Sequence, residues 1–128
     1  MLNTIKRLMI VSVLMLVGGA AHADAMQIYY CNQHEDASDE QVDDIASQWY
    51  KAARTMKGGE NLQMWLRFPI AAQAGPTDFV MVLVAPTFEE WGEFTDAYEG
   101  SPAEEVDDNF EEIADCTRTT IWESHQVQ

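Results

Sequence analysis

The feature that most constrains the fold of this chain is the order in which two hydrophobic periodicities alternate along it. Four segments have the β-branched, aromatic or alternating composition of strands, and they span residues 26–32, 62–71, 79–85 and 117–124. Apolar residues recur every three or four positions from Val42 to Met56, and again after Pro86, which indicates amphipathic helices. We therefore expect an α+β fold of ferredoxin-like βαββαβ order, with a four-stranded antiparallel sheet and helices on one face.

Capping signals mark where the helices begin. A Ser or Thr followed three residues later by Gln or Glu can satisfy two free amides of a helix start reciprocally. Three such pairs occur, the last with a proline at the first helical position: Ser38 and Gln41, Thr87 and Glu90, Ser101 and Glu104. The first helix should run about 18 residues to Gly58-Gly59, and Gly100 should divide the second helical segment in two.

The two cysteines provide an independent check on this topology. Cys31 ends the first predicted strand and Cys116 directly precedes the last, and these strands are antiparallel neighbours in the expected sheet. The chain has no CxxC pair and no histidine at ligand spacing from either cysteine, which argues against a redox or metal-binding pair. We predict a structural Cys31–Cys116 disulfide, with no metal site.

Residues 1–23 have the layout of a secretory signal peptide. Lys6 and Arg7 precede a short apolar run, and Ala21 and Ala23 occupy the positions before a cleavage site. The alternative is a retained membrane anchor, although the apolar run is short for a span. We expect residues 24–128 to form one domain that is periplasmic or secreted, with no membrane association after cleavage.

The net charge of the chain argues against nucleic acid as a partner. The chain has 22 acidic and 7 basic side chains, and its formal net charge is −15. Removal of residues 1–23 would take away two basic residues and no acid, which makes the rest more acidic still. Such a chain repels phosphate backbones, so we expect no nucleic-acid partner.

The sheet face away from the helices should be too apolar to remain in water. Alternate residues of 79–85 point to it, and either Tyr29 or Tyr30 contributes from the first strand. We assign the following residues to a ligand-binding or dimer face: Tyr29, Trp65, Arg67, Arg118 and Trp122. Pairing of two such faces predicts a homodimer, whereas the alternative is a monomer whose C-terminal tail covers the sheet.

The central strand running into an aromatic-rich helix, DFVMVLVAPTFEEWGEF, resembles the dimeric α/β-barrel superfamily. That superfamily includes antibiotic-biosynthesis-monooxygenase-type and stress-responsive domains, and the resemblance covers residues 26–125. It implies a dimer that holds a small organic molecule between or beneath its sheets, and some members oxidise quinol-like or haem substrates. The Asn, His and Trp arrangement of haem-degrading members is not found here, so no catalytic residue is carried over.

Motifs that would indicate catalysis are missing from the sequence. There is no nucleophile elbow, P-loop or dinucleotide fingerprint. His34, Glu35 and Asp36 could form a base or metal site but are better explained as solvated loop residues. The acidic run from Glu104 to Glu112 lacks calcium-loop spacing and is better explained as a solvated helix face.

Together these patterns favour an exported small-molecule-binding or stress-associated accessory protein that needs no cofactor, with its ligand at the sheet face. One alternative is a cofactor-independent monooxygenase or isomerase acting in a sheet-lined cavity. Another is a module that binds a protein partner through the apolar sheet face. With no catalytic motif found, the sequence leaves enzymatic activity uncertain and favours binding.

Overall fold

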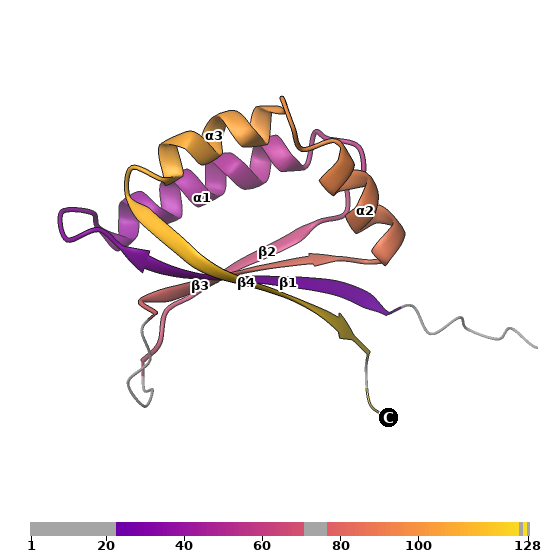
Figure 1. Ribbon diagram of the computed structural model, residues 1–128, viewed down its shortest axis with the longest axis horizontal. Helices are drawn as coiled ribbons and strands as arrows, with labels where there is room; N and C mark the ends of the chain where they lie inside the picture. The colour runs from indigo at the N-terminus through magenta and orange to yellow at the C-terminus, as the bar shows by residue number, and fades with distance from the viewer. Residues whose placement is uncertain (1–22, 71–76, 126, 128) are drawn as a thin grey trace, which may run out of the picture.

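The chain folds as one antiparallel sheet with three helices packed on one of its faces (Figure 1). A computed structural model describes residues 23–70, 77–125 and 127 of the 128-residue chain. The elements in chain order are β1 (Asp24–Gln33), α1 (Asp39–Ala53), β2 (Gln63–Arg67), β3 (Phe79–Ala85), α2 (Phe88–Asp96), α3 (Pro102–Phe110) and β4 (Ala114–Ser124). The strand order β2-β3-β1-β4, antiparallel throughout, confirms the predicted ferredoxin-like α+β fold.

Two strands differ in length from the prediction. β2 ends at Arg67 instead of continuing to residue 71. Pro69, just beyond it, has no backbone N–H to donate to a neighbouring strand. β4 begins three residues before the predicted start, because Ala114 and Asp115 pair with the end of β1 although neither residue favours strands. Pairing with an existing strand therefore outweighs local propensity at this position.

Helix α1 begins where its capping box predicts but ends earlier than Gly58. The Ser38 hydroxyl accepts a bond from the Gln41 amide at 3.3 Å, and the Gln41 side chain accepts from the Ser38 amide at 2.8 Å. The helix ends at Ala53, and a series of turns then leads to Gly58, whose φ is 76°. That left-handed conformation favours glycine, and a Cβ there would meet the backbone of α2.

The other two capping pairs form only in part. Thr87 accepts from the Glu90 amide at 3.1 Å, but the Glu90 carboxylate accepts instead from the Asn61 side chain at 3.1 Å. Ser101 accepts from the Glu104 amide at 3.2 Å, while the Glu104 carboxylate accepts from the amide of Gly100. Both helices therefore begin at the predicted residues, and their carboxylates bind elsewhere.

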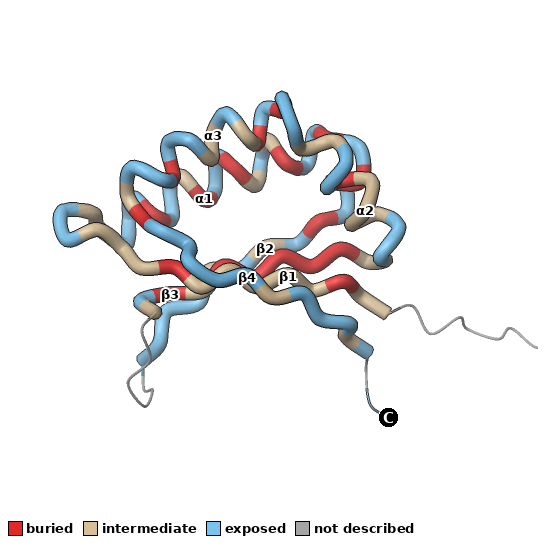
Figure 2. Tube along the Cα trace, in the orientation of Figure 1, coloured by how far each residue is buried: buried red, intermediate tan, exposed pale blue. Residues whose placement is uncertain are grey.

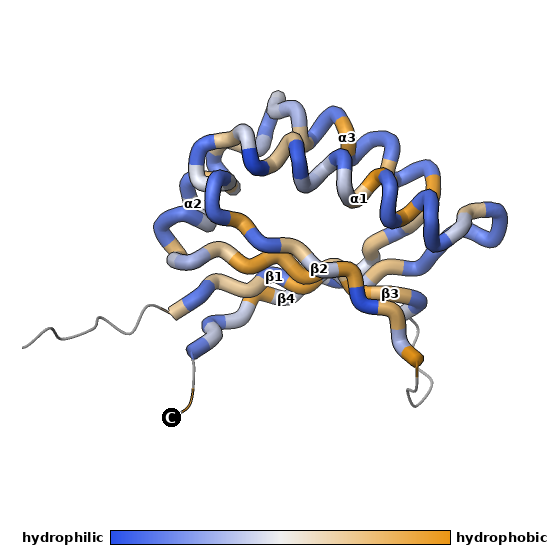
Figure 3. Tube along the Cα trace, turned by 180° about the vertical axis from the view of Figure 1, so that it is seen from behind, coloured by the Kyte–Doolittle hydropathy of each residue, from blue (hydrophilic) through white to orange (hydrophobic). Residues whose placement is uncertain are grey.

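The core lies between the sheet and the helices, where buried residues face one another (Figure 2). One cluster includes Trp49, Leu62, Leu83 and Phe94, and a second includes Val42, Phe79 and Phe110 beside Cys31. Hydrophobic residues are concentrated along the sheet, and the outward turns of the helices are hydrophilic (Figure 3). This is the distribution expected when helices bury one stripe against a sheet.

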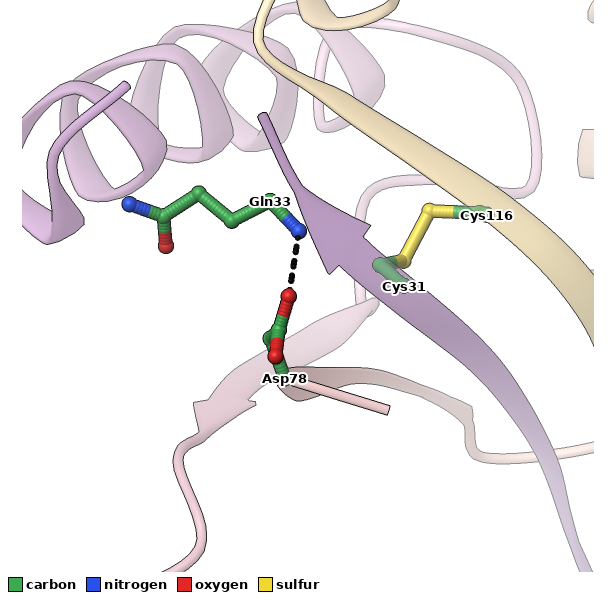
Figure 4. The surroundings of a disulfide bond; sticks show 4 residues. All are labelled: Cys31, Gln33, Asp78 and Cys116. Carbon is green, nitrogen blue, oxygen red and sulfur yellow. Dashed lines mark hydrogen bonds between the residues drawn. A yellow bond between two sulfur atoms is a disulfide. The ribbon is translucent and has the colours of Figure 1, made fainter. Parts of the chain in front are cut away.

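The predicted disulfide is present and joins β1 to β4 (Figure 4). Cys31 and Cys116 are partners in the strand register, 85 residues apart in sequence, with Cα atoms 3.9 Å apart. The register shifts between Tyr30 and Cys31, which places a bulge in β4 beside the disulfide. The amide of Gln33 donates to the Asp78 carboxylate at 2.9 Å, which ties the start of β3 to the same end of β1.

The predicted signal peptide falls almost entirely outside the residues that the structure describes. Among the helices that are described, none is both long and apolar enough to span a bilayer.

Candidate functional site

Four of the five assigned face residues lie on the sheet face away from the helices. Trp65 pairs with Val82 of β3, and Arg67 pairs with Val80. Arg118 pairs with Tyr30, and Trp122 pairs with Met26, on the same side of β1. In the described part of the chain no helix or strand covers this side, which we call the open face (Figure 1).

The open face is apolar at its centre and partly exposed at its edges. Trp65 and Trp122, on the two edge strands, are 42% and 54% exposed. The Arg118 guanidinium lies 3.8 Å from the centre of the Tyr30 ring, so a cation–π contact accommodates its charge on an apolar sheet. The composition expected of this face is thus present, and its role in binding or pairing stays a prediction.

Tyr29 is the one assigned residue that lies on the opposite face. Strand side chains alternate, and Tyr29 pairs with Met81 and Thr119 on the side covered by the helices. The sequence left Tyr29 and Tyr30 open, and the register places Tyr30 on the open face. Assigning Tyr29 to the open face was therefore wrong.

Tyr29 instead lines the larger of two adjoining cavities between the sheet and the helices. This cavity has a volume of about 520 Å³, and its walls include Trp49 from α1, Phe110 from α3 and Thr119 from β4. A neighbouring cavity of about 320 Å³ lies under α2 and is lined by Gln27 and Trp91. Three residues line both cavities: Tyr29, Tyr98 and Asp107. We call the two together the helix-side cavity.

A chain of hydrogen bonds crosses the wall of the helix-side cavity. The indole N–H of Trp49 donates to the Tyr98 hydroxyl at 3.0 Å, and that hydroxyl donates to Asp107 Oδ2 at 2.9 Å. These groups come from α1, from the turn after α2 and from α3, so the packing of three helices assembles the chain. On the other side, the indole N–H of Trp91 donates to Gln27 Oε1 at 3.1 Å.

Burial shifts the pKa values of the polar groups in this wall. Burial, followed by the nearby Asp107 carboxylate, raises the pKa of Tyr29 to about 12, although a hydrogen bond with Gln27 opposes the shift. Burial also raises the pKa of Tyr98. For Asp107, burial raises the pKa and the hydrogen bond from Tyr98 opposes it, while the charges of Asp108 and Glu104 raise it further.

These shifts define what the wall can do chemically. Both phenols remain protonated at neutral pH, so each is a hydrogen-bond donor and acceptor and not a base. Asp107 is the carboxylate that lines both parts of the cavity, so it could accept a proton or a hydrogen bond from a ligand in either part. The helix-side cavity therefore offers a small molecule both aromatic surfaces and several acidic or polar groups.

His34 is held more firmly than the solvated loop residue that we predicted. Its Nε2 lies 3.0 Å from Asp115 Oδ2, and its Nδ1 lies 3.0 Å from the carbonyl oxygen of Glu112. The bond with Asp115, followed by the bond with Glu112, raises the pKa of the exposed imidazole. Glu35 and Asp36 are exposed, and the hydrogen bonds of the His34 ring go to Glu112 and Asp115 instead.

Across the described residues, no group of three or more His, Cys, Asp or Glu side chains is arranged to hold a metal ion.

The acidic helix α3 contains the residue that matters most here, Asp107, and sequence reasoning treated it as part of a solvated face. Its position was the available signal: Asp107 follows the buried Ala103 by four residues and precedes the buried Phe110 by three. That spacing places Asp107 at the edge of the inner stripe.

In the sequence, Tyr98 and Trp49 are distinguishable only as members of the apolar stripes of the two predicted helical segments. Each has an apolar body and a polar tip, and such residues usually find a partner for the tip when buried. A sequence cannot show that these particular tips meet. Their meeting depends on the turn between α2 and α3, which brings Tyr98 beside α1.

Comparisons with known proteins come from structure alone. The chain matches no protein-family model and no curated protein sequence. A hydroxynitrile lyase from Passiflora edulis superposes with a TM-score of 0.57 at 11% identity, over 84% of this chain and 96% of the lyase. A protein from Arabidopsis thaliana gives 0.55 at 8% identity, over 83% and 96% of the two chains.

A dimeric ferredoxin-like protein of unknown function from Thermobifida fusca superposes with a TM-score of 0.53 at 10% identity, over 81% of this chain and 92% of the other. Identities this low show a shared fold and nothing finer. The predicted ferredoxin-like fold is thereby confirmed, and the resemblance to the dimeric α/β-barrel superfamily extends as far as this fold.

Proposed function

We propose that this protein is an exported homodimer that binds a small organic molecule in the helix-side cavity. The observation that carries the proposal is the convergence of Tyr29, Tyr98 and Asp107 on a cavity of about 520 Å³. Small-molecule sites commonly occupy roughly 300–1,000 Å³ and combine aromatic walls with a few polar groups. The ligand therefore lies on the helix side of the sheet and not at the open face that we expected from the sequence.

The position of the arginines differs from what we expected of a ligand binder. We expected a ligand binder to have Arg67 or Arg118 at its cavity wall. Both extend from the open face, and neither lines the helix-side cavity. Arg118 is already in contact with Tyr30.

The open face supports the homodimer. It carries exposed tryptophans on both edge strands around a centre of valines, an apolar surface of the kind that proteins cover. The similar Thermobifida fusca protein is described as dimeric. Trp65→Asp should therefore give monomers in analytical ultracentrifugation, while Gln48→Asp, on an exposed turn of α1, should leave the dimer intact. A Trp65→Asp variant that stays fully dimeric would remove the open face as the interface.

Export is supported by the disulfide, since such bonds persist in oxidising compartments. We propose that residues 1–23 are removed and that residues 24–128 form the mature domain. Fractionation of the producing cell and mass determination of the mature chain test this. A chain that retains Lys6 and Arg7 in the cytoplasm would contradict it.

A second candidate function, a cofactor-independent monooxygenase or isomerase, is favoured by Asp107. A half-buried carboxyl group with a raised pKa is suited to accept a proton from a bound substrate. The two functions differ in whether the bound molecule is changed. Incubation of the protein with each bound compound, followed by mass spectrometry of the compound, decides between them.

The binding function itself is tested by NMR of ¹⁵N-labelled protein with a mixed set of neutral, cationic and anionic aromatic fragments. The indole N–H of Trp49 reports on the cavity because it is bonded to Tyr98 in the cavity wall. We expect some fragments to shift this resonance while that of Trp122, on the open face, stays unchanged. If no fragment at millimolar concentration shifts the Trp49 resonance, the proposed function is wrong.

A further inference from the structure

We infer that the helix-side cavity selects a small organic amine, bound as its ammonium ion by Asp107 among aromatic side chains. This inference rests on the proposed binding function and names the chemical class of the ligand. It follows from the charge of the cavity walls, the hydrogen bonds of Asp107 and the aromatic surfaces around it.

The charged side chains that line the cavity are all acidic. The larger part is lined by Asp107, Glu111 and Asp115, and the smaller part adds Glu99 and Glu104. No lysine or arginine of the described chain lines either part. A cleft lined by one sign of charge concentrates ligands of the opposite sign and repels those of its own, so carboxylates and phosphates are disfavoured.

Among these acids, Asp107 is the one whose surroundings best suit a bound cation. Asp115 is already paired with His34, and Glu111 is exposed at the margin. Asp107 is half-buried and takes no part in the ion pairs found among the described residues, which join His34 to Asp115 and Lys57 to Glu93. Its carboxylate has thus lost part of its hydration without gaining a positive partner.

The hydrogen bonding of Asp107 leaves room for a donor from a ligand. Tyr98 donates to Oδ2, and this is the hydrogen bond that the structure shows for the carboxylate. An ionised carboxylate has about four acceptor positions, so further donors can bind. An ammonium group brings three donors and a positive charge, and charge-assisted bonds to a carboxylate are about twice as strong as neutral ones.

The aromatic walls complete the match to an organic cation. Tyr29, Trp49 and Tyr98 line the same cavity as Asp107, and so does Phe110 on the same helix. Aromatic faces attract cations within about 6 Å of the ring centre, and they also bury the apolar part of a ligand. A metal ion would gain little from these walls, whereas an amine with an aromatic or aliphatic body would use all of them.

Three probes of nearly equal size test the inference: 2-phenylethylamine, 2-phenylethanol and 3-phenylpropanoate. They share a phenyl ring and a two-carbon linker and differ in charge. Titration of the purified mature protein, followed by the Trp49 indole resonance, gives the affinity of each. We expect the amine to bind at least about tenfold tighter than the alcohol, which a single charge-assisted bond would produce, and the acid to bind most weakly.

Substitutions then assign the preference to one carboxylate. Asp107→Asn keeps an acceptor for Tyr98 and removes the charge, so it should bring the amine and the alcohol to similar affinities while leaving the alcohol unchanged. Glu105→Gln is the matched control, because Glu105 is an exposed acid of α3 outside the cavity lining. It should retain the preference for the amine.

The possible failures are distinguishable. Equal binding of amine and alcohol by the unaltered protein, or tightest binding of the acid, overturns the amine assignment and leaves the binding function standing. A preference for the amine that survives Asp107→Asn also overturns the assignment to Asp107. Failure of every probe and fragment to shift the Trp49 resonance removes the binding function together with this inference.

Discussion

Tyr98→Phe is the substitution that most directly tests the hydrogen-bonded wall of the cavity. It removes one oxygen atom and leaves the buried indole N–H of Trp49 and the carboxylate of Asp107 without their shared partner. A buried donor left without a partner costs roughly 1–3 kcal/mol. Since Trp49 is only 6% exposed but adjoins a cavity that water can enter, we expect a loss of about 1–2 kcal/mol.

The loss should have a part that depends on pH. The pKa of Asp107 is raised in the folded state, so protonation of Asp107 stabilises the fold. This stabilisation is fully present below the unfolded-state pKa and is lost as the pH rises through the folded-state pKa. The bond from Tyr98 lowers that pKa, and its removal raises it further. The deficit of the variant should therefore be largest at neutral pH and smaller near about pH 4, where a carboxyl group of ordinary pKa is half protonated.

Urea unfolding of both proteins at several pH values measures this difference in free energy, and thermal unfolding measures the matching change in melting temperature. Near neutral pH the melting temperature should fall by roughly 4–16 °C, given about 4–8 °C per kcal/mol for a domain of about this size. In an Asp107→Asn background the pH-dependent part of the stability deficit should vanish, and the part of the deficit due to Trp49 should remain. Tyr30→Phe, whose hydroxyl is outside this wall, is the control. A Tyr98→Phe deficit that is negligible, or that grows on acidification, would refute the reasoning.

Three further outcomes are expected. Reduction of the disulfide should lower the melting temperature without abolishing the fold, because the chain-entropy model gives the bond a stabilisation of roughly 4–5 kcal/mol. An unchanged melting curve would count against the bond. Gly58→Ala should lower the free energy of unfolding, measured in urea, by more than the control Gly100→Ala. Both glycines have a positive φ, but only at Gly58 would a Cβ meet the backbone of α2. Equal effects of the two substitutions would contradict this. Asp115→Asn should lower the pKa of the His34 imidazole in an NMR titration, because their hydrogen bond is the largest cause that raises it, and an unchanged pKa would show that the bond is absent in solution.

The sequence predicted the topology because its periodicities and its cysteines are independent signals that agree. A slip of one residue between the first and last strands would have placed Cys31 and Cys116 out of register, and the structure pairs them directly. Boundaries were less predictable where tertiary pairing decides them. Ala114 belongs to β4 because β1 extends to meet it, and nothing in its local sequence indicates a strand.

The candidate site was less accessible to sequence reasoning because no single segment contains it. Tyr29, Trp49, Tyr98 and Asp107 come from four different parts of the chain, and each has an ordinary local explanation as a strand, stripe or surface residue. A functional motif can be recognised when its residues share one segment or one spacing. Here the constellation exists only after α1 and α3 have packed side by side over the sheet.

Tyr29 and Tyr30 show how one strand can serve both proposed roles. The backbone alternation of β1 directs Tyr29 toward Asp107 in the helix-side cavity and Tyr30 toward Arg118 on the open face. The disulfide at Cys31 fixes the register of β1 against β4 immediately beside them. Because a slip of one residue would exchange the two faces, this crosslink holds both the cavity wall and the open face in place. Loss of the bond should therefore weaken ligand binding and pairing together, even where the domain stays folded.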